Sequence, residues 1–121
     1  MKIIIPLAPV TKKNSQQIFR GKNGRPFITQ SERYKQYEIA TGYYLKPLGI
    51  ANKVNVQAIY YMPSRRKVDL INLHSALHDC MVKHGTVVDD NSNIIVSTDG
   101  SRVDYDKDKP RTEVEIKEVQ G

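Results

Sequence analysis

The chain has 121 residues, of which 39% are hydrophobic and 26% are charged. This composition is typical of one globular domain spanning residues 1–121, and it excludes collagen-like and fully disordered chains. No apolar run approaches the roughly 18 residues of a membrane-spanning helix, and the opening apolar run is broken at Pro6, too early for a signal peptide. We therefore expect a cytoplasmic protein with no membrane partner.

The charge is positive and unevenly distributed. Lys and Arg total 19 against 13 Asp and Glu, a net charge of +6. Basic residues crowd the segment 11–35 and recur at Arg65–Lys67, whereas every aspartate follows residue 68. This arrangement favours a polyanion, with nucleic acid the first candidate, bound on a basic surface beside an acidic centre. The single cysteine, Cys80, excludes an intrachain disulfide and a Cys-rich zinc site.

The first part of the chain predicts a strand and a hairpin. Residues 2–6 form a β-branched run ended by proline, which indicates a strand. Residues 18–20 and 25–29 flank Gly21–Gly24, where Asn and Gly supply the backbone angles of a tight turn. We expect a basic, exposed hairpin here.

A helix and a longer strand are predicted next. Ser31 and Glu32 suit a helix N-terminus, and the proline and glycine after Lys46 end the helix there. Its inward face would hold Tyr34, Tyr37, Tyr44 and Leu45. Residues 52–62 alternate, which predicts a half-buried strand. Its buried face would hold Val54, Val56, Ala58 and Tyr60.

The most informative segment is a helix over residues 69–84. Asp69 stands at the N-cap position and Gly85 follows as a stop signal. Apolar residues recur at helical spacing, at Leu70, Leu73, Leu77, Cys80 and Met81. A separate stripe runs through Asp69, Asn72, Ala76, Asp79 and Lys83. One helix therefore offers a core face and a polar face.

The last part of the chain predicts two more strands, over residues 93–98 and 112–119. Between them, residues 99–100 suit a turn and residues 104–109 a charged loop. The whole pattern predicts an α+β fold with a mixed or antiparallel sheet of about four strands and two helices.

Carboxylates at the start of the 69–84 helix and in the Asp89–Asp90 pair form the candidate chemical site. Mg²⁺ takes oxygen ligands and keeps several of its waters. Such an ion would stabilise charge on a phosphodiester and activate water, while neighbouring Lys and Arg hold the polyanion. The residues therefore favour metal-assisted phosphodiester hydrolysis, provided that Asp69, Asp89 and Asp90 lie close together.

The order of residues around these acids is distinctive. Residues 62–73 read Met-Pro-Ser-Arg-Arg-Lys-Val-Asp-Leu-Ile-Asn-Leu, Asp79 follows in the helix, and Gly85 precedes Val88–Asn91. This order resembles the RusA family of Holliday-junction resolvases. Weaker likenesses, at Pro6–Pro9 with Asn14–Ser15 and at Pro110–Arg111, extend it over most of the chain. The resemblance implies a homodimeric endodeoxyribonuclease, dependent on Mg²⁺ or Mn²⁺, that nicks two strands of a four-way DNA junction symmetrically.

The resemblance also implies roles for individual residues. Asp69, Asp89 and Asp90 would be catalytic and hold the metal ion, with Asn72 and Asp79 in supporting positions. Independently of the resemblance, Arg65, Arg66 and Lys67 stand just before the acidic centre, so we expect them to contact DNA phosphates. We extend the same role to Lys12, Lys13, Asn14, Arg20 and Arg25.

Two positions depart from the family's pattern. Its Asp-Leu-Asp-Asn-Leu motif has Ile71 at the third place here, and Ser75 stands where the next helical turn carries a lysine. Because isoleucine cannot ligate a metal, an alternative is a branched-DNA-binding protein with weakened or absent catalysis. A third hypothesis, an RNA- or single-strand-binding adaptor, would need stacking aromatics in the hairpin, where Phe19 and Phe27 are the candidates.

Each candidate also has a purely structural explanation. Asp69 could cap its helix, and Asp89–Asn91 could form an ordinary turn. His74 and His78 have a spacing suited to zinc but no evident third ligand, so a solvated face or a subunit contact explains them better. Core or dimer packing explains the helical tyrosines better than base stacking does; these are Tyr34, Tyr37, Tyr43 and Tyr44. Cys80 is best explained as a small buried hydrophobe.

Overall fold

The computed structural model describes residues 1–12, 16–20, 26–30 and 32–120, and for residues 16–20 and 26–30 it describes the backbone alone. The elements in chain order are β1 (Lys2–Ile5), β2 (Gln16–Arg20), β3 (Pro26–Gln30), α1 (Glu32–Thr41), β4 (Val54–Met62), α2 (Leu70–Lys83), β5 (Ile95–Ser97), β6 (Arg102–Tyr105) and β7 (Arg111–Glu118). The predicted α+β class is confirmed.

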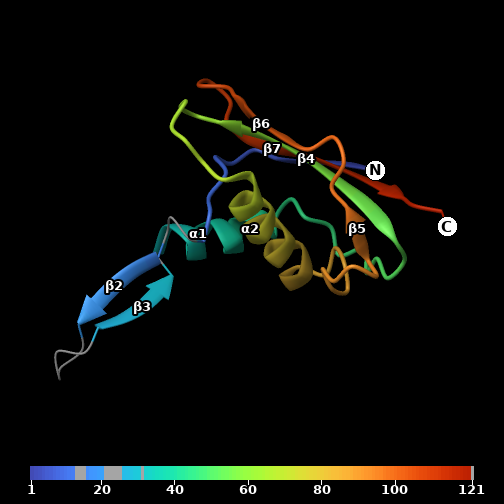
Figure 1. The fold of residues 1–121 in the computed structure, drawn as a ribbon, viewed down its shortest axis with the longest axis horizontal. Coiled ribbons are helices and arrows are strands. Elements are labelled where there is room, and N and C mark those ends of the chain that lie inside the picture. Colours follow the sequence, from blue (N-terminus) through green and yellow to red (C-terminus); the bar gives the residue numbers. More distant parts are fainter. Residues whose placement is uncertain (13–15, 21–25, 31, 121) are drawn as a thin grey trace.

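The main sheet has five strands and is mixed. Its order is β1-β7-β4-β5, and β6 pairs with the other half of the same β4 edge. Strand β4 runs antiparallel to β7 but parallel to both β5 and β6. Both helices lie on the same side of this sheet (Figure 1). The sheet therefore has one strand more than the sequence predicts.

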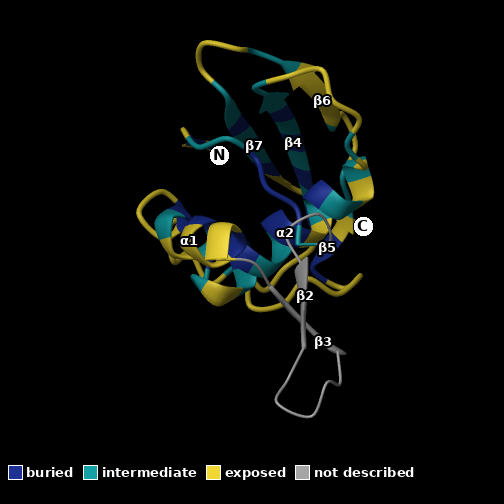
Figure 2. Ribbon diagram, turned by 90° about the vertical axis from the view of Figure 1, so that its left-hand side faces the viewer, coloured by how far each residue is buried: buried dark blue, intermediate teal, exposed yellow. Residues whose placement is uncertain are grey.

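The core lies between β4, β7 and the two helices. Strand β4 buries every second residue, as its alternation predicts: Val54, Val56, Ala58 and Tyr60. Helix α2 contributes its predicted apolar positions, and Leu73, Leu77, Cys80 and Met81 are all at most 1% exposed. Figure 2 shows this buried layer running along β4 and β7. Burial of the apolar stripe supplies most of the free energy that keeps α2 helical.

The structure has a strand, β6, where the sequence predicts the start of a loop. Residues 104–109 were expected to form one charged loop, but Asp104 and Tyr105 belong to β6. Three of the four β6 residues are exposed. The strand therefore lacks the alternation of buried and exposed positions by which a strand is predicted from sequence. The strand forms because its backbone pairs with β4 from Ile59 to Met62.

Helix α1 ends earlier than expected, at Thr41 rather than near Lys46. The Thr41 hydroxyl donates to the carbonyl of Glu38 (2.8 Å), and the ring of His84 bonds the same carbonyl (2.7 Å). A Cβ at Gly42 would lie 2.7 Å from the His84 ring, so the close approach requires glycine. A contact from the end of α2 therefore terminates α1. As a result Tyr44 lies beyond the helix and is 38% exposed, whereas Tyr34, Tyr37 and Leu45 are buried as predicted.

The predicted hairpin is present. Strands β2 and β3 pair antiparallel as a separate two-stranded sheet that projects from the rest of the chain (Figure 1). Its turn, residues 21–24, lies outside the described residues. Within the described part of the chain, no helix is long and apolar enough to cross a membrane.

Candidate nucleic-acid and metal site

Asp69 is the N-cap of α2. Its backbone is extended (φ −91°, ψ 121°), and its Oδ1 accepts a hydrogen bond of 3.0 Å from the backbone N–H of Ile71. Caps of this kind contribute about 0.5–2 kcal/mol to stability. The structural explanation of Asp69 is therefore confirmed. Ile71, the second residue of α2, is 74% exposed.

Asp89 organises the acidic loop after α2. Its Oδ1 accepts from the N–H of Asp90 (2.7 Å), and its Oδ2 accepts from the amide of Asn91 (3.0 Å). The side chain of Asn91 in turn accepts from the N–H of Asn93 (2.9 Å). These bonds, led by the one from Asp90, lower the pKa of Asp89. The turn expected from the Asp and Asn residues is confirmed.

The pKa of Asp90 reflects both its partial burial and the charge of Asp79 on α2. Partial burial raises the pKa of Asp90, and the negative charge of Asp79 raises it further. Asp79 also forms an ion pair with Lys12, whose ammonium lies 5.8 Å from the centre of the Tyr34 ring. Sequence reasoning placed Asp79 in a supporting role but missed both contacts. No local spacing signals them, because Lys12 and Asp90 are far from Asp79 in the sequence.

No described hydrogen bond or ion pair joins Asp69 to Asp89 or Asp90. Asp69 caps the start of α2, and Asp79, whose charge acts on Asp90, lies ten residues further along the same helix. Among the described residues, no group of three or more His, Cys, Asp or Glu could hold a metal ion. The joint binding of a metal ion by Asp69, Asp89 and Asp90 therefore stays a prediction.

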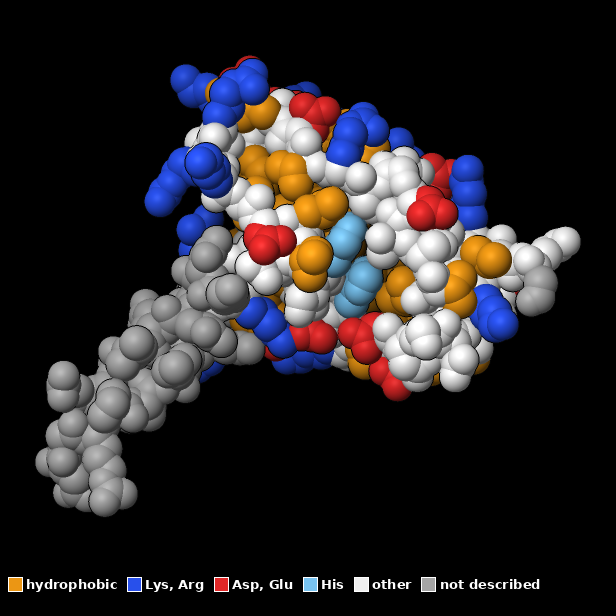
Figure 3. All heavy atoms as spheres, in the orientation of Figure 1, with side chains coloured by type: hydrophobic (Ala, Val, Ile, Leu, Met, Phe, Trp, Pro, Cys, Tyr) orange, Lys and Arg blue, Asp and Glu red, His pale blue; other side chains and the backbone are white. Residues whose placement is uncertain are grey.

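The basic loop between β4 and α2 is exposed. Arg65, Arg66 and Lys67 all face solvent, and Figure 3 shows Lys and Arg side chains gathered at this edge of the molecule. The guanidinium of Arg65 lies 4.4 Å from the centre of the Tyr105 ring on β6. Of the other predicted DNA contacts, Lys12 is paired with Asp79, and the side chains of Lys13, Asn14, Arg20 and Arg25 lie outside the described residues.

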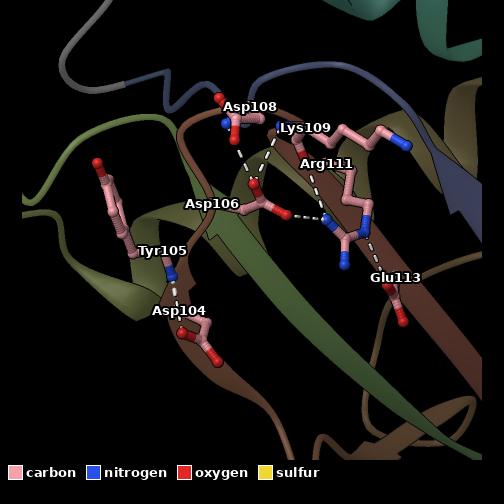
Figure 4. A network of polar contacts seen from close by, with 7 residues as sticks. All are labelled: Asp104, Tyr105, Asp106, Asp108, Lys109, Arg111 and Glu113. Atoms are coloured by element: carbon pink, nitrogen blue, oxygen red, sulfur yellow. Dashed lines mark hydrogen bonds and ion pairs between the residues drawn. The ribbon is translucent and has the colours of Figure 1, made fainter.

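A polar network fixes the segment next to this loop (Figure 4). Arg111 at the start of β7 donates to Asp106 (2.8 Å) and Glu113 (2.7 Å), and its guanidinium lies 3.9 Å from the centre of the Tyr61 ring. Asp106 also accepts the N–H groups of Asp108 and Lys109 (3.1 Å each). Arg111 therefore ties the loop after β6 to β7 and β4.

The two histidines of α2 are half-buried. Nδ1 of His74 lies 2.7 Å from the hydroxyl of the buried Tyr60, and the rings of His74 and His78 stack with centroids 5.5 Å apart. Nε2 of His78 is buried and has no hydrogen-bond partner among the described residues. Figure 3 shows two neighbouring histidine side chains between apolar side chains. Asn72 is partly buried on the adjacent face.

An α+β sheet with a basic loop next to a capped helix and an acidic turn points to a protein that handles nucleic acid. A comparison with protein families supplies the particular class. The family model described as endodeoxyribonuclease RusA matches residues 6–117, nearly the whole chain. The chain therefore belongs to the RusA endodeoxyribonuclease family, as the motif order in its sequence predicts. A search of curated proteins gives no match. Holliday-junction resolution is the nuclease activity that the family implies.

Proposed function

We propose that this chain is a divalent-metal-dependent endonuclease that resolves four-way DNA junctions by paired, symmetric nicks. The observation that carries the proposal is the family match over residues 6–117. The net charge of +6 and the exposed cations before α2 support it, because phosphate contacts dominate affinity for DNA. Resolvases of this family generally depend on a divalent metal, and we propose Mg²⁺, with Mn²⁺ as a substitute.

We propose Asp69, Asp89 and Asp90 as the metal-binding carboxylates. Carboxylate oxygens are the ligands that Mg²⁺ prefers, and the bound ion would activate water and neutralise phosphoryl charge. Asp89 holds the acidic turn in shape, and the charge of Asp79 acts on Asp90. The carboxylate of Asp69 lies at the positive end of the α2 dipole, which favours a negatively charged phosphate nearby. Asn72 and Asp79 are proposed as supporting residues.

The cations close to these acids are proposed to hold the DNA backbone. Arg65, Arg66 and Lys67 immediately precede the α2 cap, and Lys12 stands beside Asp79. Lys13, Asn14, Arg20 and Arg25 extend the same role along the hairpin. Since a single centre cuts a single strand, symmetric resolution requires a second copy related by a two-fold axis. We therefore propose a homodimer as the active form.

The substitution Asp90→Asn tests the assignment. It removes one charge from the acidic loop with almost no change in volume. We expect junction cleavage in Mg²⁺ to fall by more than about 100-fold, since loss of a partner outside the metal shell alone costs 10–100-fold. Binding of the same junction in EDTA should be retained. Cleavage is followed on a labelled four-way junction, with linear duplex as the comparison substrate.

Asp99→Asn is the matched control, because Asp99 is an exposed acid in the turn before β6 and lies outside the proposed site. It should cleave like the wild type. Equal cleavage by wild type and Asp90→Asn would refute the catalytic assignment. Cleavage of linear duplex in preference to the junction would refute the proposed substrate.

A second candidate, a junction-binding protein without catalysis, follows from Ile71 and Ser75. Both side chains are exposed, so the double change Ile71→Asp and Ser75→Lys should leave stability nearly unchanged. If the chain is a nuclease, the wild type cuts junctions and the double variant cuts them faster. Cleavage by the double variant alone would assign the natural chain to the binding class.

A further inference from the structure

A pocket of about 410 Å³ opens beside the basic loop. It lies where the chain leaves β1, where α1 begins and where β4 ends. Its lining includes the cations Arg33, Arg66 and Lys67 and the apolar residues Val10, Met62 and Val68. Its volume lies within the range of pockets that hold small organic ligands, about 300–1,000 Å³.

The charged lining of the pocket is entirely cationic. Arg33, Arg66 and Lys67 come from two separate elements, and no Asp or Glu is among the lining residues. None of the three cations forms an ion pair within the described part of the chain, whereas Arg111 and Lys83 elsewhere are paired with carboxylates. Because these three cations have no carboxylate partner among the described residues, they are suited to bind a negatively charged phosphate group.

The rest of the lining combines apolar side chains with the polar residues Thr11 and Ser64. Val10 is 9% exposed, and Met62 and Val68 pack against the core. A site for a bare inorganic anion needs no such walls. A cationic rim with an aliphatic wall matches a nucleotide, in which a phosphate and a flat, weakly polar base are joined at a short distance.

The pocket adjoins a second hollow of about 250 Å³, and Arg66 lines both. Arg65 lines the second hollow and is stacked on Tyr105 of β6, whereas Lys67 lines the pocket. A DNA strand crossing the loop would pass from one hollow to the other, close to the α2 cap.

We propose that this pocket holds one unpaired nucleotide of branched DNA. Arg33, Arg66 and Lys67 bind its phosphate, and its base lies against Val10, Met62 and Val68. A flap carries unpaired nucleotides, and at the centre of a four-way junction the stacking of the paired bases is interrupted, so a nucleotide there is extruded at lower cost than one within linear duplex. The pocket would thus contribute to selecting branched DNA. The inference rests on the proposed function for the source of the nucleotide, but the pocket's chemistry can be tested without cleavage.

The first experiment uses thymidine 5′-monophosphate with metal-free protein. Methyl NMR should show that the nucleotide shifts Val10, Met62 and Val68 together, and that thymidine or inorganic phosphate binds at least 10-fold more weakly. Arg33→Gln and Lys67→Gln should each weaken nucleotide binding about 10-fold. Lys46→Gln removes the same charge from an exposed site outside the pocket and should have no effect. Shifts that spread over other surfaces, or equal losses in all three variants, would overturn the proposal.

The second experiment places the nucleotide in DNA. A four-way junction with one extra unpaired thymidine at the branch point is compared, in EDTA and at fixed salt, with the same junction carrying an abasic residue there. We expect the wild type to bind the first at least five-fold more tightly, and Arg33→Gln to lose that preference. Equal affinity would overturn the proposal, even if the mononucleotide shifts the methyl groups. Neither experiment needs cleavage. If the protein cleaved no junction but still preferred the junction with the unpaired thymidine, the nuclease function would be refuted and the pocket proposal would stand.

Discussion

His78 is the residue whose surroundings differ most from those that its sequence position suggests. Its ring is stacked on His74, and its Nε2 is buried without a partner in the described part of the chain. Burial, with a smaller contribution from His74, lowers the pKa of His78 to about 4. The ring therefore stays neutral in the folded protein at pH values where an exposed histidine is protonated.

This predicts a loss of stability in mild acid. The pKa of His78 is lower in the folded chain than in the unfolded chain, so the unfolded chain binds more protons between about pH 4 and 6.5. The stabilising effect is present above pH 6.5 and is lost as the pH falls towards 4. In His78→Leu that loss is absent. Between pH 7.5 and 5, the free energy of unfolding should fall by about 2 kcal/mol more in the wild type than in the variant.

Urea unfolding at the two pH values measures this difference. Ser75→Leu is the control, because it adds the same side chain to the exposed face of α2 and keeps His78. The control should retain the pH dependence of the wild type. If the free energies of unfolding of wild type and His78→Leu changed equally with pH, the pKa of His78 would be the same in the folded and the unfolded chain, and the prediction would be wrong.

At the scale of elements, the contacts of one side chain join β7 to the loop after β6. Arg111 contacts Asp106, Glu113 and the ring of Tyr61. The hydrogen bond from Arg111 is the leading reason that the pKa of Asp106 is lowered. A carboxylate whose pKa is lower in the folded chain than in the unfolded chain stabilises the fold at pH values above its unfolded pKa. This stabilisation is lost as the pH falls through the pKa of the folded chain.

We therefore expect Arg111→Gln to lower the melting temperature by several degrees at pH 7. The difference from wild type should shrink at pH 3, where protonation removes the same pairing from both proteins. Lys117→Gln is the matched control on β7, since its exposed pair with Glu115 spans 3.4 Å and contributes little. Differential scanning calorimetry at both pH values provides the measurement. A deficit that stays constant with pH would mean that Arg111 acts through packing alone.

The elements differ in how far their sequences predict them. Helix α2 follows from the spacing of Leu73, Leu77 and Met81 and from the Asp69 cap, all of which act within a few residues. Strand β6 has no such pattern, and it forms because β4 offers an unpaired edge. The end of α1 is set by His84, which is 43 residues beyond Thr41. Local signals cannot report contacts of that range.

At the scale of the whole molecule, the fold arranges charged groups along the length of α2. The N-terminus of α2 carries Asp69 and the cationic loop, and its C-terminal half carries Asp79, which pairs with Lys12 and whose charge acts on Asp90. The proposed homodimer would bring a second set of these groups to the same DNA. The pocket between α1 and the basic loop adds a surface that only packing of distant segments creates.

The sequence by itself determined the α+β class, the capped helix α2, the buried face of β4, the hairpin and the family, because these depend on local spacing and residue order. Only the tertiary structure decided that Lys12 pairs with Asp79, that Nε2 of His78 is buried without a partner among the described residues, and that Arg33 joins Arg66 and Lys67 around one pocket. The physical reason is that such contacts depend on the strand order and on how helices pack across the sheet, which no short stretch of sequence specifies.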